Sequence, residues 1–170
     1  MKALLAATFA VAALLVIGGG AGAVSGSPID QWWLQGAIQG DRFEVAGGVY
    51  AEKNAQTPEA RALAAQLVGD HRHSLGNAIG LARHLGIAVP KAPSPVQQWL
   101  IVTLKGMKSG SAYDQAYTSL AVKDHMQDIA DTQLEIKSGR IPAVVTMAKH
   151  ELKTLKVHLI LAQKAMHAST

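Results

Sequence analysis

The stretch TPEARALAAQLVGDHRHSLGNAIGLARHLG, residues 57–86, decides the fold class. Thr57 can cap a helix, proline follows at the first helical position, and Gly86 stands before a proline-rich connection, so the pattern predicts one long helix. At about 100° per residue, the apolar residues share one face, and His71 lies at its centre. His73 and His84 lie about 200° and 220° further round, so both are predicted to point outward.

The rest of the chain predicts three more long helices. They run from residue 28 to about 56, from about 111 to 137, and from 142 to about 167, and a short helix is expected over 96–107. No alternation typical of strands and no phosphate-binding glycine loop competes with this interpretation. The chain is 49% hydrophobic but only 5% aromatic, which fits helices packed through small aliphatic residues. The sequence therefore predicts an all-α four-helix bundle with an extra short helix in the long central connection.

The N-terminal stretch MKALLAATFAVAALLVIGGGAGAVSGSP has one lysine, a short apolar run and an A-x-A pattern at residues 21–23. This layout is typical of a secretory signal peptide, and the apolar run is short for a membrane span of about 20 residues. We expect residues 1–23 to be a signal peptide and residues 24–170 to form a single domain. The mature protein is then periplasmic or otherwise associated with the envelope.

The amino-acid composition limits the kinds of metal site and of binding partner that the chain can have. The chain has no cysteine, which excludes disulfides and thiolate ligands, so any metal must be held by His, Asp and Glu. The formal net charge is +4, but no cluster of Lys and Arg interleaved with aromatic residues occurs. We therefore expect no nucleic-acid partner. Association with the envelope or a membrane is compatible with export, and the sequence names no protein partner.

Each long helix carries one histidine or carboxylate on its predicted inner face. These residues are Glu44, His71, His125 and His158. A buried polar side chain costs several kcal/mol unless it is paired or bound to a ligand, and helical bundles build metal sites from such groups. Neutral imidazole and carboxylate suit Fe, Zn, Mn or Cu. The alternative is that these side chains hydrogen-bond one another and only fix the helix register.

Two further sets of polar residues allow more than one interpretation. Asp124, Asp128, Asp131 and Glu135 form a stripe that is most simply a solvent face, the alternative being an access route for cations. Glu151 lies on the core face of the last helix, but about 10 Å along the helix from His158, too far to bind the same ion from the same height.

Three segments carry a resemblance to a known family: FEVAGGVYAEKNAQTPEARALAAQLVGDH, GSAYDQAYTSLAVKDH and MAKHELKTLKVHLILAQ. Over residues 31–165 the chain resembles the exported bacterial family called domain of unknown function 4142, which is grouped with ferritin-like four-helix proteins. The matching positions include Glu44, Asp70 with His71, Asp124 with His125, and His158. The resemblance implies a ferritin-like bundle and export, but it supplies no established activity.

The sequence departs from ferritin-like di-iron proteins at the positions that matter for catalysis. Those proteins use Glu-x-x-His, whereas Val68, Val122 and Leu155 stand three residues before the histidines here. Iron storage and oxygen chemistry therefore do not transfer from the fold. The leading hypothesis is an exported bundle that binds a transition metal in metal handling or envelope stress. An enzyme would need an open coordination position, and the third hypothesis is an interaction module without metal.

Overall fold

The computed structural model describes residues 27–169, which form five helices. Their bounds are α1 Pro28–Asn54, α2 Pro58–His84, α3 Pro95–Gly106, α4 Ser111–Ser138 and α5 Pro142–Ala168. No strand occurs within these described residues. The predicted all-α class, the four long helices and the additional short helix in the central connection are confirmed, with each boundary within about two residues of its prediction.

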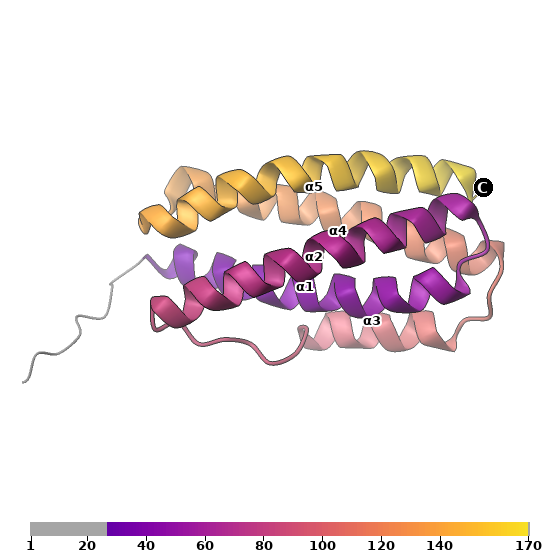
Figure 1. The fold of residues 1–170 in the computed structure, drawn as a ribbon, viewed down its shortest axis with the longest axis horizontal. Coiled ribbons are helices and arrows are strands. Elements are labelled where there is room, and N and C mark those ends of the chain that lie inside the picture. The colour runs from indigo at the N-terminus through magenta and orange to yellow at the C-terminus, as the bar shows by residue number, and fades with distance from the viewer. Residues whose placement is uncertain (1–26, 170) are drawn as a thin grey trace, which may run out of the picture.

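The four long helices form an elongated bundle (Figure 1). Helix α1 packs mainly on α2, α4 packs mainly on α5, and the two pairs meet largely through α2 and α5. The connection through α3 returns the chain along the bundle, so that α2 and α4 run in the same direction (Figure 1). Helix α3 contacts α1 and α4 from outside the bundle. A long connection between the two hairpins is the topology of ferritin-like bundles.

Local signals in the sequence set the helix ends. The side chain of Thr57 accepts a hydrogen bond from the backbone N–H of Ala60, as expected for an N-cap. Gly86 follows α2 with a φ of 68°, a conformation in which a side chain would be strained. Ser94 caps α3 in the same way as Thr57 caps α2, by accepting from the N–H of Gln97. These signals cut the chain into the lengths that the bundle needs.

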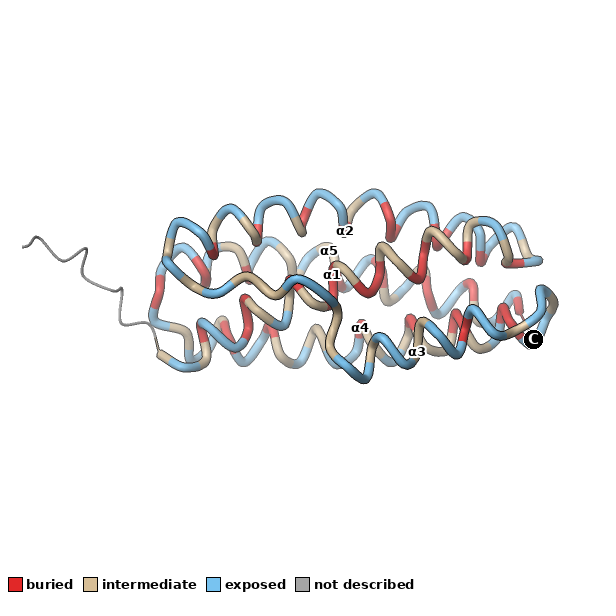
Figure 2. Tube along the Cα trace, turned by 90° about the horizontal axis from the view of Figure 1, so that it is seen from below, coloured by how far each residue is buried: buried red, intermediate tan, exposed pale blue. Residues whose placement is uncertain are grey.

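The core consists of two apolar clusters with a polar layer between them. One cluster includes Ala51, Leu63, Leu67, Tyr113, Tyr117 and Ala162, and the other includes Trp33, Leu34, Ile38, Ala78, Val144 and Ala148. Buried residues occur along the inner sides of all four long helices (Figure 2). Between the two clusters, every long helix contributes a buried polar residue, among them Glu44, His71, His125 and His158. The apolar clusters hold these side chains away from bulk water.

Small residues bring α1 and α2 close together. A Cβ atom at Gly48 would lie 2.6 Å from Cγ2 of Val68 and 3.2 Å from the carbonyl oxygen of Ala64. No side chain fits this space without a shift of the neighbouring helix. The close approach helps to place the polar residues of α1 against those of α2.

The predicted signal peptide, residues 1–23, lies outside the described residues. Among residues 27–169, no helix is both long and apolar enough to span a membrane.

Candidate metal centre

Three histidines from three different helices meet in the polar layer. His71 of α2, His125 of α4 and His158 of α5 each offer one ring nitrogen, and these nitrogens lie within 4.8 Å of one another. The three residues are between 0% and 5% exposed. Their ring centroids are 5.1 to 5.6 Å apart. The sequence predicted all three as inward residues, and the structure brings them together.

The ring of His71 is oriented by a carboxylate on α1. Nδ1 of His71 donates a hydrogen bond of 2.7 Å to Oδ1 of Asp41, and both side chains are buried. In the neutral ring, Nδ1 carries the proton of this bond and the other nitrogen, Nε2, has the lone pair that a metal ion would need. Nε2 of His71 is buried and has no hydrogen-bond partner. This nitrogen is therefore available to a ligand from the bundle interior.

His125 has the same arrangement with a backbone partner. Nδ1 of His125 lies 2.9 Å from the carbonyl oxygen of Ala121, which can only accept, so Nδ1 must donate. Burial, reinforced by the neighbouring His71, lowers the pKa of His125 from 6.5 to about 3. The ring is consequently neutral at ordinary pH, and its Nε2 keeps a lone pair.

His158 is oriented by a residue adjacent to His71 in the sequence. Nε2 of His158 donates to Oδ2 of Asp70 over 2.8 Å. Burial lowers the pKa of His158 despite the opposing effect of Asp70, and the bond to His158 helps to lower the pKa of Asp70 against the effect of burial. His158 is thus neutral at ordinary pH, and its Nδ1 keeps the lone pair.

The unprotonated ring nitrogens of His125 and His158 lie at a distance typical of two ligands of one metal ion. Nε2 of His125 and Nδ1 of His158 are 3.3 Å apart, yet their other nitrogens already hold the protons, so no hydrogen bond joins them. Two imidazole nitrogens bound tetrahedrally to one ion at about 2.0–2.1 Å are separated by about 3.3–3.4 Å. Carboxylates or carbonyls bound to the opposite ring nitrogens are also the usual support of metal-binding histidines. The three-histidine group can hold a metal ion.

The fourth predicted ligand, Glu44, is buried beside the group rather than within it. Its Oε1 lies 3.9 Å from Nδ1 of His125, the nitrogen that bonds to Ala121. Burial, followed by the nearby Asp124 carboxyl group, raises the pKa of Glu44 well above 4.5. Burial likewise raises the pKa of Asp124. These two carboxyl groups form a protonatable pair next to the histidines.

The interpretation of the acidic stripe on α4 as a solvent face is wrong. Glu135 is fully buried, and Asp124, Asp128 and Asp131 are half-buried around a cavity in the bundle. The prediction failed because the stripe lies beside the seam with α1, where the small residues Gly36, Ala37 and Gly40 leave space. Glu151 also lines this cavity, close to Ser74.

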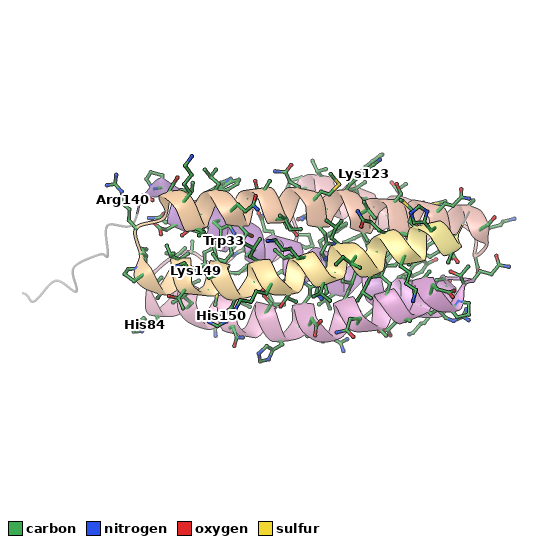
Figure 3. All side chains as sticks on the ribbon, turned by 90° about the horizontal axis from the view of Figure 1, so that it is seen from above. Trp33, His84, Lys123, Arg140, Lys149 and His150 are labelled. Atoms are coloured by element: carbon green, nitrogen blue, oxygen red, sulfur yellow. The ribbon has the colours of Figure 1, made fainter. Side chains whose placement is uncertain are left out.

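The remaining histidines lie outside the group. His73, His84, His150 and His167 are exposed, in agreement with their helical phase. His84 and His150 lie at the outer surface, while Trp33 lies between the helices (Figure 3). Trp33 donates from Nε1 to Oγ1 of Thr132, so its role is packing together with one buried hydrogen bond.

Sequence reasoning missed Asp41, the partner of His71. Asp41 precedes Glu44 by three residues, so both lie on the same helix face, and this spacing was the available signal. Asp70 precedes His71 in the sequence but does not orient it. Instead, Asp70 orients His158 on another helix.

The family model for domain of unknown function 4142 (DUF4142) matches residues 19–165. The chain belongs to this family. Two solved structures have a fold similar to that of this chain. A conserved hypothetical protein from Mycobacterium tuberculosis has a TM-score of 0.63 and 18% sequence identity, and the match covers 82% of this chain and 92% of that protein. A DUF305 fragment from Deinococcus radiodurans has a TM-score of 0.68 and 14% identity, and the match covers 84% of this chain and 97% of the fragment. No curated protein matches the sequence. At these identities the likeness concerns the fold alone.

Proposed function

We propose that this DUF4142 protein is an exported metal-binding bundle that holds one transition-metal ion through His71, His125 and His158. The proposal rests on one observation: one nitrogen of each ring is engaged by Asp41, the Ala121 carbonyl or Asp70, and the three buried rings meet so closely that one nitrogen of each lies within 4.8 Å of the others. Rings that served only to pack the core would be expected to pair all their buried nitrogens. Nε2 of His71 has no partner.

The three histidine ligands limit which metal ions the site would bind. Three neutral imidazoles favour Zn²⁺, Cu²⁺ or Fe²⁺ over Mg²⁺ and Ca²⁺, which prefer oxygen ligands. Mn²⁺ is weaker in the same series. Three protein ligands also leave a coordination position for water or another ligand, and Glu44 is the nearest candidate carboxylate on the His125 side. We place the protein in the periplasm or at the envelope, in metal handling or stress tolerance.

The test is the metal content of untagged residues 24–170, purified from the periplasm without chelators. We expect about one transition-metal ion per chain, since a site of three histidines and one open position is mononuclear. The double variant His71→Ala, His158→Ala should lose this metal. His84→Ala should retain it, because His84 is exposed on the same helix as His71.

Two outcomes would reject the proposal. Equal metal content in the wild type and the double variant would place the metal elsewhere. A metal-free wild type that still takes up none after incubation with Zn²⁺, Cu²⁺ and Fe²⁺ would mean that the histidines form a structural cluster. The search would then move to binding partners at the envelope.

A further inference from the structure

A cavity of about 220 Å³ adjoins His71, one of the three histidines. The cavity lies between the long helices, and its lining includes Ser94 and Gln97 at the N-terminal end of α3. Its lining includes exposed residues such as Trp32 and Gln127 as well as the buried Asp41 and His71. The cavity therefore extends from the surface of the bundle to the ring of one proposed ligand.

The charge of this cavity is one-sided. Its lining residues include five carboxylates, and no lysine or arginine is among them; the five are Asp41, Asp124, Asp128, Asp131 and Glu151. The whole chain has only 12 acidic residues against 16 basic ones, so this concentration runs against its net charge of +4. Burial raises the pKa of Asp128 and of Glu151, so these acids gain their charge most readily when a cation lies beside them. A cavity lined by such groups attracts and concentrates cations.

Two buried oxygen atoms at the inner end lack partners. Asp41 is 5% exposed, and its Oδ1 accepts from His71 while its Oδ2 has no hydrogen-bond partner. Oδ2 of Asp124 is also buried and without a partner. A carboxylate oxygen removed from water without a donor is costly, so both oxygens are suited to a ligand that carries donors.

The carboxylates do not form a cage for a bare ion. Within residues 27–169, the three histidines are the one group of three or more such side chains that converges closely enough to bind a metal directly. The size of the cavity fits a hydrated ion instead. Six water molecules at about 30 Å³ each occupy about 180 Å³, which is less than the 220 Å³ present. Carboxylates around such an ion accept hydrogen bonds from its bound water.

We propose that the cavity is a second cation site, which holds a hydrated divalent metal ion through its water shell and passes it to the three histidines. Asp128 and Asp131 attract the ion, and Asp41 and Asp124 receive it beside His71. The transfer rests on the proposed function, because it needs the histidines as its destination. The hydrated-cation site itself does not.

The first experiment tests the cavity in protein that lacks two of the three histidines, His125 and His158, neither of which lines the cavity. Binding of Mn²⁺ to mature protein with His125→Gln and His158→Gln is measured by water-proton relaxation. Adding Asp128→Asn and Asp131→Asn should weaken Mn²⁺ binding about ten-fold, as expected for the loss of two nearby charges. Glu52→Gln with Glu59→Gln makes the same change in net charge outside the cavity lining and should leave binding unchanged.

The second experiment keeps the histidines and does not depend on the folding of the first variant. Uptake of Co²⁺ is followed by its visible absorption after rapid mixing. The Asp128→Asn, Asp131→Asn protein should take up the same final amount about ten-fold more slowly, with a weaker dependence on ionic strength. The Glu52→Gln, Glu59→Gln protein should match the wild type.

The outcomes separate the two proposals. Unchanged Mn²⁺ binding and an unchanged Co²⁺ uptake rate would overturn the cavity site while leaving the histidine site intact. Carboxylate-dependent Mn²⁺ binding in a protein whose histidines take up no metal would support the cavity site and reject the proposed function. Binding of putrescine without binding of Mn²⁺ would overturn the inference, because the cavity would then accept an organic amine.

Discussion

The ends and the middle of the bundle both bury charged residues, but they treat them differently. At one end, Asp30 is fully buried and accepts hydrogen bonds from the backbone N–H groups of residues 140 and 141, each with a bond of 2.9 Å. At the other end, buried Asp114 accepts from the N–H groups of residues 56 and 57. Each aspartate ties down the connection that closes a helical hairpin.

In the middle, the polar side chains are oriented but not satisfied. His71 is fixed by Asp41, yet Nε2 of His71 and Oδ2 of Asp41 both lack partners. The end aspartates bond to backbone groups that the fold itself supplies, so their role is complete within the chain. The central groups are held in place but keep buried polar atoms without a partner. The contrast separates buried polar residues that close the fold from those that await a ligand.

The largest effect on stability is expected from Asp30→Ala. The change leaves the N–H groups of Arg140 and Ile141, and the hydroxyl of Ser27, without their acceptor. The N–H of Ile141 is buried and costs about 1–3 kcal/mol when unsatisfied, and each of the two partly buried bonds contributes about 0.5–1.5 kcal/mol, so the free energy of unfolding should fall by about 3 kcal/mol. Urea denaturation measures this loss. The variant's metal content should equal that of the wild type; a loss of metal at retained fold would contradict the division of roles.

A smaller loss of stability is expected from His71→Ala in metal-free protein. It leaves a cavity and removes the donor to buried Asp41, which should cost about 2 kcal/mol. His73→Ala, on the exposed side of the same helix, should change stability by less than about 0.5 kcal/mol. Thermal unfolding in the presence of a chelator compares the two. Equal melting temperatures would show that His71 contributes nothing to the fold.

The sequence predicted the inward residues well, because each depends only on the period of one helix. His71, His125 and His158 lie in apolar stripes, and the position within the stripe fixes which way a side chain points. It failed to predict the partners across helices. The bond from His158 to Asp70 depends on how far α5 is shifted along α2, and the bond from His71 to Asp41 depends on the rotation of α1. The periodicity of a single helix predicts neither the shift between two helices nor the rotation of one against another.

The acidic stripe shows the same limit. Asp124, Asp128 and Asp131 have the spacing of an exposed face, and only the small residues opposite them on α1 turn that face into a cavity wall. Packing between helices, rather than residue type, decides whether an aspartate faces solvent or a cavity. The candidate ligands were therefore predictable, while the support of those ligands and the route to them were not.

The smallest expected effect on stability comes from Glu135, which lies at the same end of the bundle as Asp30. Glu135 is fully buried beside Asp30, whose carboxylate is the group nearest to hydrogen-bonding with it. Burial, followed by the charge of Asp30, raises the pKa of Glu135 from 4.5 to about 7. Between these two values the folded protein binds a proton that the unfolded chain releases, so this group makes stability fall as the pH rises from about 4.5 to about 7. Above pH 7 the cost is fully present.

Glu135→Gln removes that cost, because the amide stays neutral and can donate to Asp30. The variant should be more stable than the wild type by about 1 kcal/mol at pH 8 and nearly equal to it at pH 4.5. Urea denaturation at both pH values measures the difference, with Glu52→Gln as a control whose effect should not change with pH in this way. A gain that is the same at pH 4.5 and pH 8 would mean that Glu135 is not titrating in this range. Glu135 would then be a buried carboxyl group that the fold does not satisfy, like those of the central layer, and the distinction between the end and the middle of the bundle would not hold for it.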